Sequence, residues 1–348
     1  MQTSPNYLKQ MGMQLKPYTR PIVWRSILQI ATTYLPFFLL FALSCRIMEQ
    51  HWAWSIPLNI LAGLFLVRIF ILQHDAGHGS FFPNRRANNA LGFVCSILTM
   101  VPYAAWQYTH AIHHSTSSNL DKRGVGDVYT MTLQEYLDAT PWQRLRYRVF
   151  RHPLAMYLLG PFVVFMVGYR IPMGISRRKP ALFRSVMYTN LGIALYIAAI
   201  VALFGWKAVW LVYLPVQYVA SAVGLFLFYV QHQFEDTYWE RDPRLEFLRA
   251  GLEGASYLRL PRVLQWLTGN IGFHHVHHLA PRIPNYLLEK AYREVPELQM
   301  APTLTLKDAI QAAFADLHLY DEERKHLVGF RDAARLLRQR KVEGHAVS

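Results

Sequence analysis

Cysteine and charged residues are both scarce in this sequence. Among its 348 residues there are only two cysteines, Cys45 and Cys95, and both lie inside apolar runs. Neither a disulfide framework nor a cysteine-based metal site is therefore expected. Charged residues make up 17% of the chain, below the roughly 25% that is usual for soluble domains. This shortage disfavours a soluble enzyme and predicts that much of the chain lies in lipid.

Acidic residues are the scarcer of the two charge types. The chain has 22 Asp and Glu against 36 Lys and Arg, a formal net charge of +14. No nucleic-acid-binding motif accompanies this excess, so a nucleic-acid partner is not expected. The basic residues instead fit the positive-inside rule and attraction to anionic lipid headgroups. The sequence also lacks the HExxH motif of zinc proteases.

Long apolar runs predict the membrane topology. A crossing takes about 20 residues, and four runs qualify, with Arg68 expected to reach toward the headgroups from the second. Two further apolar segments contain prolines and are expected to be re-entrant or interfacial. The four predicted spans are residues 26–46, 52–73, 186–206 and 208–231, and the two partial segments are residues 87–109 and 154–170.

The basic residues also predict the orientation. They crowd the segment before residue 26 and the connections flanking the partial segments, whereas the two predicted hairpin turns carry one each, Arg46 and Lys207. The positive-inside rule then places the N-terminus and residues 232–348 in the cytoplasm. The expected fold is a single all-α integral membrane domain. It would have about four transmembrane helices, two partial segments and a cytoplasmic cap rich in histidine.

Histidines are concentrated in three short motifs. HDAGH follows the second span, HAIHH follows the first partial segment, and HHVHH lies in the cap. Spacings of three and four residues bring imidazoles onto one helix face. One further histidine, His232, directly follows the fourth span. The motif histidines are His74, His78, His110, His113, His114, His274, His277 and His278.

A single histidine at a helix end is more often a polar cap than a ligand. Three clusters at helical spacing on one predicted membrane face are better explained by metal binding. A mononuclear zinc site needs only four ligands, so eight or nine histidines indicate two metal ions. Neutral nitrogen ligands suit iron, zinc, copper and nickel, and the ligand type alone leaves these open.

The motifs HDAGHGSFF, HAIHHSTSSNLDKRGVGDV, YVQHQFEDTYW and GNIGFHHVHHLAPRIPNY, in this order, resemble the membrane fatty acid desaturase family. The resemblance runs from about residue 72 to residue 286 and is closest to bacterial acyl-lipid desaturases. It implies an O2-dependent oxidoreductase in which the eight motif histidines bind two iron ions. Such an enzyme takes two electrons from a separate donor and places a cis double bond in a lipid-linked acyl chain.

The resemblance also bears on the electron donor and on the location. The sequence lacks the HPGG motif of a fused cytochrome b5 domain, so the expected donor is a separate ferredoxin or cytochrome b5. The expected location is the bacterial inner membrane, with the active site on the cytoplasmic side.

The resemblance does not settle the roles of two histidines. Animal acyl-CoA desaturases have an Asn four residues before the histidine that corresponds to His232, whereas this chain has Phe228. A histidine that ends an apolar span needs a polar partner, so we predict His232 as a ninth ligand. His275 would point about 100° away from His274 on a helix, and we predict that it is not a ligand.

Metal-bound imidazoles usually donate their second N–H to a carboxylate or carbonyl. Asp75, Asp127, Glu235 and Asp236 are near enough in sequence to accept such bonds.

Two other functions fit parts of the sequence. The same iron scaffold supports hydroxylation or ketolation of a lipid or carotenoid, because the outcome depends on how the substrate is held. A membrane metal-binding or transport protein is the other alternative. Transport requires polar groups at the membrane midplane, and the predicted spans carry no charge inside them apart from Arg68.

Overall fold

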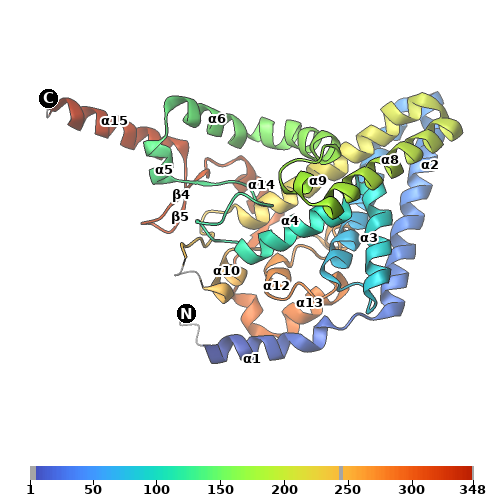
Figure 1. Ribbon diagram of the computed structural model, residues 1–348, viewed down its shortest axis with the longest axis horizontal. Coiled ribbons are helices and arrows are strands. Elements are labelled where there is room, and N and C mark those ends of the chain that lie inside the picture. Colours follow the sequence, from blue (N-terminus) through green and yellow to red (C-terminus); the bar gives the residue numbers. More distant parts are fainter. Residues whose placement is uncertain (1–4, 243–245, 347–348) are drawn as a thin grey trace.

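The computed structural model describes residues 5–242 and 246–346, with side chains described for residues 10–242 and 246–340. Helices dominate this part of the chain, and its strands are only two or three residues long. Figure 1 shows long helices on one side of the molecule and shorter helices on the other. The predicted all-α membrane architecture is confirmed.

The first long helix, α2 (Val23–His78), folds back on itself. Its 56 residues would extend about 84 Å if straight, against a hydrocarbon core of about 30 Å. The helix is broken at His51, where φ is −143° and ψ is 68°. The two halves lie side by side, since the Ser44 hydroxyl donates a 2.7 Å hydrogen bond to the Asn59 side-chain oxygen. α2 is therefore a hairpin, and its break falls between the first two predicted spans.

The second long helical run, Pro180–His232, is built in the same way. Its break is at Gly205, whose φ of 76° lies in the left-handed region that favours glycine. The rings of Tyr196 and Tyr213 meet edge to face with centroids 5.8 Å apart, so the two arms pack together. The run consists of α8 (Pro180–Ala208), the π-helical η5 (Val209–Tyr213) and α9 (Leu214–His232).

The two hairpins pack tightly against each other. The Asn59 side-chain amide donates a 2.8 Å hydrogen bond to the Leu211 carbonyl. A Cβ at Gly63 would lie 2.6 Å from the Val219 side chain, so only glycine permits this approach of α2 and α9. Because both helices continue from this contact to the ends that carry His78 and His232, their packing fixes where those ends lie.

The first predicted partial segment, residues 87–109, is a pair of helices bent by 100°. The bend is at Met100, which has a φ of 58°. Gly92 permits the close packing of the pair, because a Cβ there would lie 2.2 Å from the Tyr103 ring. The Tyr103 hydroxyl in turn donates to the Ala76 carbonyl at 2.9 Å and holds the pair against the end of α2. The helices are α3 (Arg85–Thr99) and α4 (Tyr103–Thr116).

The second predicted partial segment, residues 154–170, is wound in π-helical and 3-10 turns. It directly follows the amphipathic helix α6 (Pro141–Arg151), and we call residues 154–170 the lateral segment. Its turns are η2 (Leu154–Leu159), η3 (Pro161–Val167) and η4 (Gly168–Arg170), and α7 (Ile175–Arg178) follows.

Within the described chain, three helical runs are long and apolar enough to cross a membrane. They are Val23–His78, Leu154–Arg178 and Pro180–His232, and the bent α3–α4 pair would make a fourth if it is one span. The first and third runs have 56 and 53 residues, enough for two crossings each.

The cap packs against the ends of α2 and α9. Two small sheets lie in this region: β2 pairs in parallel with β3, and β4 of the cap lies between the antiparallel β5 and the parallel β1, which precedes the cap in sequence. The elements before the first hairpin and between α4 and α6 are α1 (Pro5–Leu15), η1 (Lys16–Thr19), β1 (Met131–Thr132) and α5 (Leu133–Asp138). Those after α9 are α10 (Phe247–Glu253), β2 (Tyr257–Arg259), α11 (Arg262–Leu267), α12 (His274–Leu279), α13 (Asn285–Glu294), η6 (Pro296–Met300), β3 (Thr303–Thr305), α14 (Leu306–Phe314), β4 (Leu319–Asp321), β5 (His326–Val328) and α15 (Phe330–Ala346).

Arg68 does not reach toward the headgroups as predicted. Its side chain is buried, and its Nε–H donates a 3.0 Å hydrogen bond to the Thr33 hydroxyl. The guanidinium lies 4.1 Å from the centroid of the Trp266 ring and also donates to the Trp266 carbonyl. The expectation was wrong because the cap supplies a carbonyl and an aromatic face within reach of the guanidinium. Arg68 therefore connects both arms of the first hairpin to α11.

We expect Arg68→Ala to lower the thermal stability of the purified protein. The buried Thr33 hydroxyl would lose the hydrogen bond that it accepts from Arg68, and leaving a buried acceptor unsatisfied costs about 1–3 kcal/mol. Thermal unfolding in detergent measures the effect. Arg46→Ala, which removes an exposed arginine from the same helix, should leave the melting temperature unchanged. Equal melting temperatures for both variants would show that Arg68 does not hold the cap.

Candidate metal centre

The first histidine motif ends α2. The helix ends at Gly79, whose left-handed φ of 67° is typical of a residue that terminates a helix. His74 and His78 are one turn apart on one face, with ring centroids 4.8 Å apart. The helix end therefore presents two imidazoles in the same direction, as the spacing predicts.

Three other helices deliver the remaining histidines. α4 carries His110, His113 and His114, and the short helix α12 carries the cap motif. His232 is the last residue of α9. These elements are far apart in sequence, and the packing of α4 and the cap against α2 and α9 brings their histidines together.

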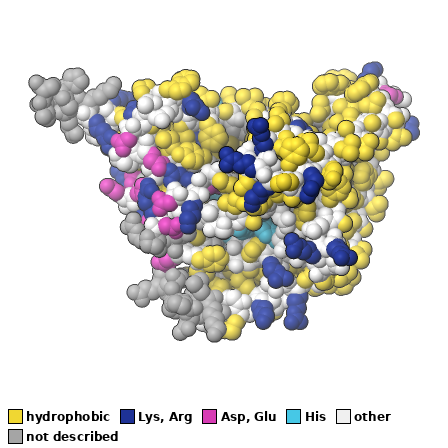
Figure 2. Space-filling model, viewed as in Figure 1, with side chains coloured by type: hydrophobic (Ala, Val, Ile, Leu, Met, Phe, Trp, Pro, Cys, Tyr) yellow, Lys and Arg dark blue, Asp and Glu magenta, His cyan; other side chains and the backbone are white. Residues whose placement is uncertain are grey.

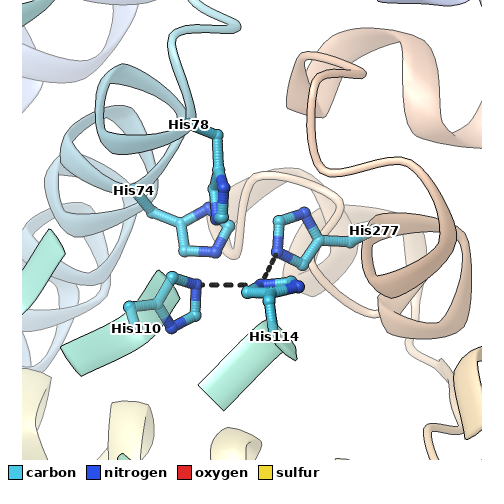
Figure 3. A group of neighbouring side chains, drawn as sticks. All are labelled: His74, His78, His110, His114 and His277. Carbon is cyan, nitrogen blue, oxygen red and sulfur yellow. Dashed lines mark hydrogen bonds between the residues drawn. The ribbon is translucent and has the colours of Figure 1, made fainter. Parts of the chain in front are cut away.

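The nine predicted histidines form two groups, each with ligand atoms within 4.8 Å of one another. Each of the second and third motifs is divided between the groups, so a motif does not correspond to one ion. Figure 3 shows the first group, whose rings converge from three directions. The first group is His74, His78, His110, His114 and His277, and the second is His113, His232, His274 and His278.

The spacing of the ring nitrogens fits ligands around a single ion in each group. Nε2 of His114 lies 3.1 Å from that of His110 and 2.9 Å from that of His277. In the second group, Nε2 of His274 lies 2.9 Å from that of His232 and 3.2 Å from that of His278. Two nitrogens bound to one ion at about 2.0–2.1 Å would be separated by about 2.9–3.4 Å.

Several of these nitrogens are buried without a hydrogen-bond partner. They include Nε2 of His78 and both ring nitrogens of His113. A buried polar atom without a partner is costly, and a bound cation would satisfy it. The donor set therefore fits two metal ions, one with five histidines and one with four.

The cap histidines are held in the neutral form that metal binding requires. Burial, followed by the neighbouring imidazoles, keeps the pKa of His274, His277 and His278 well below its usual range. A neutral imidazole has a free lone pair for a metal ion. The site is therefore ready to bind cations without first losing protons.

Two oxygen-bearing groups orient histidine rings of the site. The Asp75 carboxylate lies 3.4 Å from Nδ1 of His74 and accepts 2.7 and 2.9 Å hydrogen bonds from the backbone and side-chain N–H groups of Asn285. Nδ1 of His232 donates to the Gly254 carbonyl at 3.1 Å, which no sequence pattern indicated. Asp75 thus connects the first group to α13 in the cap.

The other three predicted carboxylates lie elsewhere. Asp127 accepts a 2.9 Å hydrogen bond from the Gly124 backbone, and burial raises its pKa. Glu235 and Asp236 are exposed, because the chain turns outward after His232. Among the described residues, none of the three makes a hydrogen bond or ion pair with a histidine of either group. Their proximity in sequence did not translate into contact because a turn separates each from the rings.

An apolar cavity of about 520 Å³ lies beside both groups. His74 and His110 of the first group and His274 of the second form part of its wall. The Trp106 ring, also in the wall, stacks on His110 at 4.5 Å. Most of its other lining is aliphatic or aromatic, including Leu66, Phe70, Val101, Phe228 and Ile271.

Phe228 lies four residues before His232, at the position where an Asn would indicate a water-bridged metal contact. Its ring centroid lies 5.3 Å from that of His113 and 5.3 Å from that of His232. An apolar ring therefore separates the four-histidine group from this part of the cavity, and His232 joins the group directly. Sequence reasoning identified Phe228 only as a departure from a pattern, without assigning it to the cavity.

Comparison with known proteins agrees with this site. The sequence profile of the family described as fatty acid desaturase matches residues 50–306. A fatty acid desaturase of Bacillus subtilis (strain 168) is 43% identical over 331 residues, which cover 95% of this chain and 93% of that protein. An sn-1 oleoyl-lipid 12-desaturase of Picosynechococcus sp. is 24% identical, covering 79% and 80% of the two chains. An sn-1 acyl-lipid omega-3 desaturase (ferredoxin) of Nostoc sp. is 26% identical, covering 78% and 75%.

The fold and the site define a helical membrane protein with two polyhistidine groups, each able to hold a metal ion, beside an apolar cavity. The chain belongs to the fatty acid desaturase family, whose members are oxidoreductases acting on fatty acyl chains. The resemblance drawn from the histidine motifs is therefore confirmed.

We expect adjacent histidines in the cap to behave differently. His274→Ala should lower the metal content, because its Nε2 lies within ligand distance of two others in the second group. His275 is fully buried against Tyr257 and Tyr292, outside both groups. His275→Ala should keep both metals but lower stability by about 1–3 kcal/mol, because it empties a packed position. Elemental analysis and thermal unfolding test the pair, and metal loss in His275→Ala would contradict the assignment.

Proposed function

We propose that this protein introduces a cis double bond into a lipid-linked acyl chain, using two iron ions, O2 and two electrons from a separate donor. The observation that carries the proposal is the apolar cavity whose wall includes histidines of both groups. A saturated chain in this cavity would lie beside both metal positions at once. The cavity excludes water from the reacting carbons, and the fixed rings hold the metals against it.

Iron is proposed because the family carries out oxidative chemistry. The histidine set suits several metals, but zinc has no redox chemistry. When bound, two irons would supply the activation of O2 that removal of hydrogen from an unactivated chain requires. The nine imidazoles would hold these ions, with Asp75 and the Gly254 carbonyl orienting His74 and His232.

A lipid carrier and a separate donor are supported by the relatives. One is named an oleoyl-lipid desaturase and another an acyl-lipid desaturase with ferredoxin. A membrane-bound carrier also has an energetic advantage. Moving a chain from the bilayer into water costs about 0.8 kcal/mol per methylene, or about 10 kcal/mol for a dozen.

We place the metal centre at the cytoplasmic side of the bacterial inner membrane. His78 and His232 lie at the same end of the two hairpins, whereas the breaks at His51 and Gly205 lie at the opposite tips. The basic residues before residue 26 and around the partial segments belong to the histidine side. The positive-inside rule assigns that side to the cytoplasm.

We expect the products to differ from the substrates by the loss of two hydrogens. The chain would be expressed in a bacterium that lacks unsaturated fatty acids of this kind, and its membrane lipids analysed by mass spectrometry. His78→Ala is the inactive control, because it removes a ligand of the first group. Products that gain one oxygen would instead establish the hydroxylase alternative.

His232→Gln should lose one iron and nearly all activity. Gln retains a polar side chain of similar reach, so a histidine that only hydrogen-bonds Gly254 could be replaced at a cost of about 1 kcal/mol or less. A ligand could not be replaced in this way. Iron content and double-bond formation are measured against the parent and against His51→Gln, an exposed histidine at the hairpin turn. Two irons per chain and activity within a few-fold of the parent would leave a site of eight histidines.

A further inference from the structure

The cavity beside the metal centre has an incomplete outer wall. The lateral segment forms this wall through residues such as Met156, Gly160 and Val164. The rest of the wall includes residues of α2 and α9, which are parts of the packed hairpins. The lateral segment, an irregular helix, therefore closes the side of the cavity next to α9.

The side chains at the edge of this wall face both the cavity and the outside. Leu159, Val163 and Val164 line the cavity and are 57%, 56% and 44% exposed. Val149 and Phe150, at the end of α6, also line it and are 58% and 45% exposed. The five residues form an apolar rim, and in Figure 2 hydrophobic side chains gather along the edge where α6 and the lateral segment lie in Figure 1. An opening rimmed in this way suits lipid rather than water.

The lateral segment is attached by polar contacts near its two ends. Near its start, the Tyr157 ring packs on the Tyr229 ring at 5.6 Å, and the Tyr218 hydroxyl donates a 3.1 Å hydrogen bond to the Leu158 carbonyl. At its end, Arg170 donates a 2.9 Å hydrogen bond to the Asn190 side-chain oxygen. Among the described residues, those from 159 to 167 make no hydrogen bond to a residue outside the segment. The stretch that borders the rim is therefore held by apolar packing alone.

The helix before the segment is suited to the membrane surface. α6 exposes Trp142 and Leu145 together with Arg146, a combination of apolar and basic side chains typical of interfacial helices. It runs directly into the rim at Val149 and Phe150. A lipid at the rim could therefore keep its phosphate beside α6 while its chain enters the cavity.

We propose that the acyl chain enters the cavity sideways from the bilayer, between α9 and the lateral segment, while still esterified to a glycerophospholipid. The apolar rim is the portal and the lateral segment is its movable wall. This inference rests on the proposed function, because it concerns how that substrate reaches the metal centre. It adds the route and the carrier chemistry, a phospholipid that never leaves the membrane.

A pair of tryptophan variants tests the portal. Val163→Trp places a large ring in the rim, whereas Leu158→Trp places the same ring on the same segment at similar exposure, 55%, away from the cavity. In proteoliposomes of the holoenzyme with saturated phosphatidylglycerol, kcat/KM should fall about tenfold for Val163→Trp and stay within about twofold for Leu158→Trp. Equal effects of the two variants would overturn the portal.

A reversible clamp tests the movement of the wall. Gly160→Cys combined with Leu225→Cys places one cysteine on each side of a close contact between the segment and α9, and the cross-link is formed by oxidation. Cys45 and Cys95 are buried and should not compete. Oxidation should reduce phospholipid desaturation about tenfold or more, and reduction should restore it. Full activity of the oxidised double variant, with the disulfide confirmed by mass spectrometry, would show that the wall does not move.

A binding readout separates this inference from the proposed function. A phosphatidylglycerol with a photoreactive diazirine near the end of one acyl chain should label cavity residues of the parent, and labelling should fall in Val163→Trp but not in Leu158→Trp. If the parent makes no double bond yet shows this labelling pattern, the proposed function fails and the portal stands. If the parent is active and neither Val163→Trp nor the oxidised double cysteine variant lowers its activity, the function stands and the portal fails. Acyl-CoA, which is water-soluble, gives a further test. The portal would also be overturned if the oxidised double cysteine variant desaturated acyl-CoA at the full rate of the parent and the parent used acyl-CoA as well as phospholipid.

Discussion

The convergence of nine imidazoles in a buried space is the constraint on which the rest of the structure depends. Ring nitrogens from different helices lie as little as 2.9 Å apart, and others are buried without a partner. Such an arrangement is unfavourable unless cations occupy it. The ends of α2, α4, α9 and α12 must therefore be positioned closely, and much of the remaining structure serves to position them. Metal binding and folding of this region are expected to be coupled.

Polar contacts between the membrane hairpins and the cap provide this positioning. Asp75 accepts both N–H groups of Asn285, Arg68 reaches Trp266, and the His232 ring donates to Gly254. Each contact joins a membrane helix to a cap element within a short distance of a ligand. The cap is thus part of the metal centre, because without it the second group would lose two of its four histidines.

The same arrangement distinguishes two parts of the cavity wall. α2 and α9 carry histidines of the two groups, whereas the lateral segment carries none. The exposed apolar side chains of the segment lie at the edge of the cavity. Movement of this segment, which the proposed entry route requires, would therefore leave the histidine groups in place.

The family of this protein and much of its outline could be read from the sequence alone. Apolar runs predicted the two hairpins, and histidine spacing predicted which imidazoles share a helix face, because both depend on local helical geometry. Tertiary structure alone decided that His113 leaves His110 and His114 to join the other group, since that choice depends on what faces each ring. It also turned Arg68 toward Trp266, left Glu235 and Asp236 in solvent, and made the Gly254 carbonyl the partner of His232. These outcomes depend on contacts between residues distant in the chain, which no local pattern records.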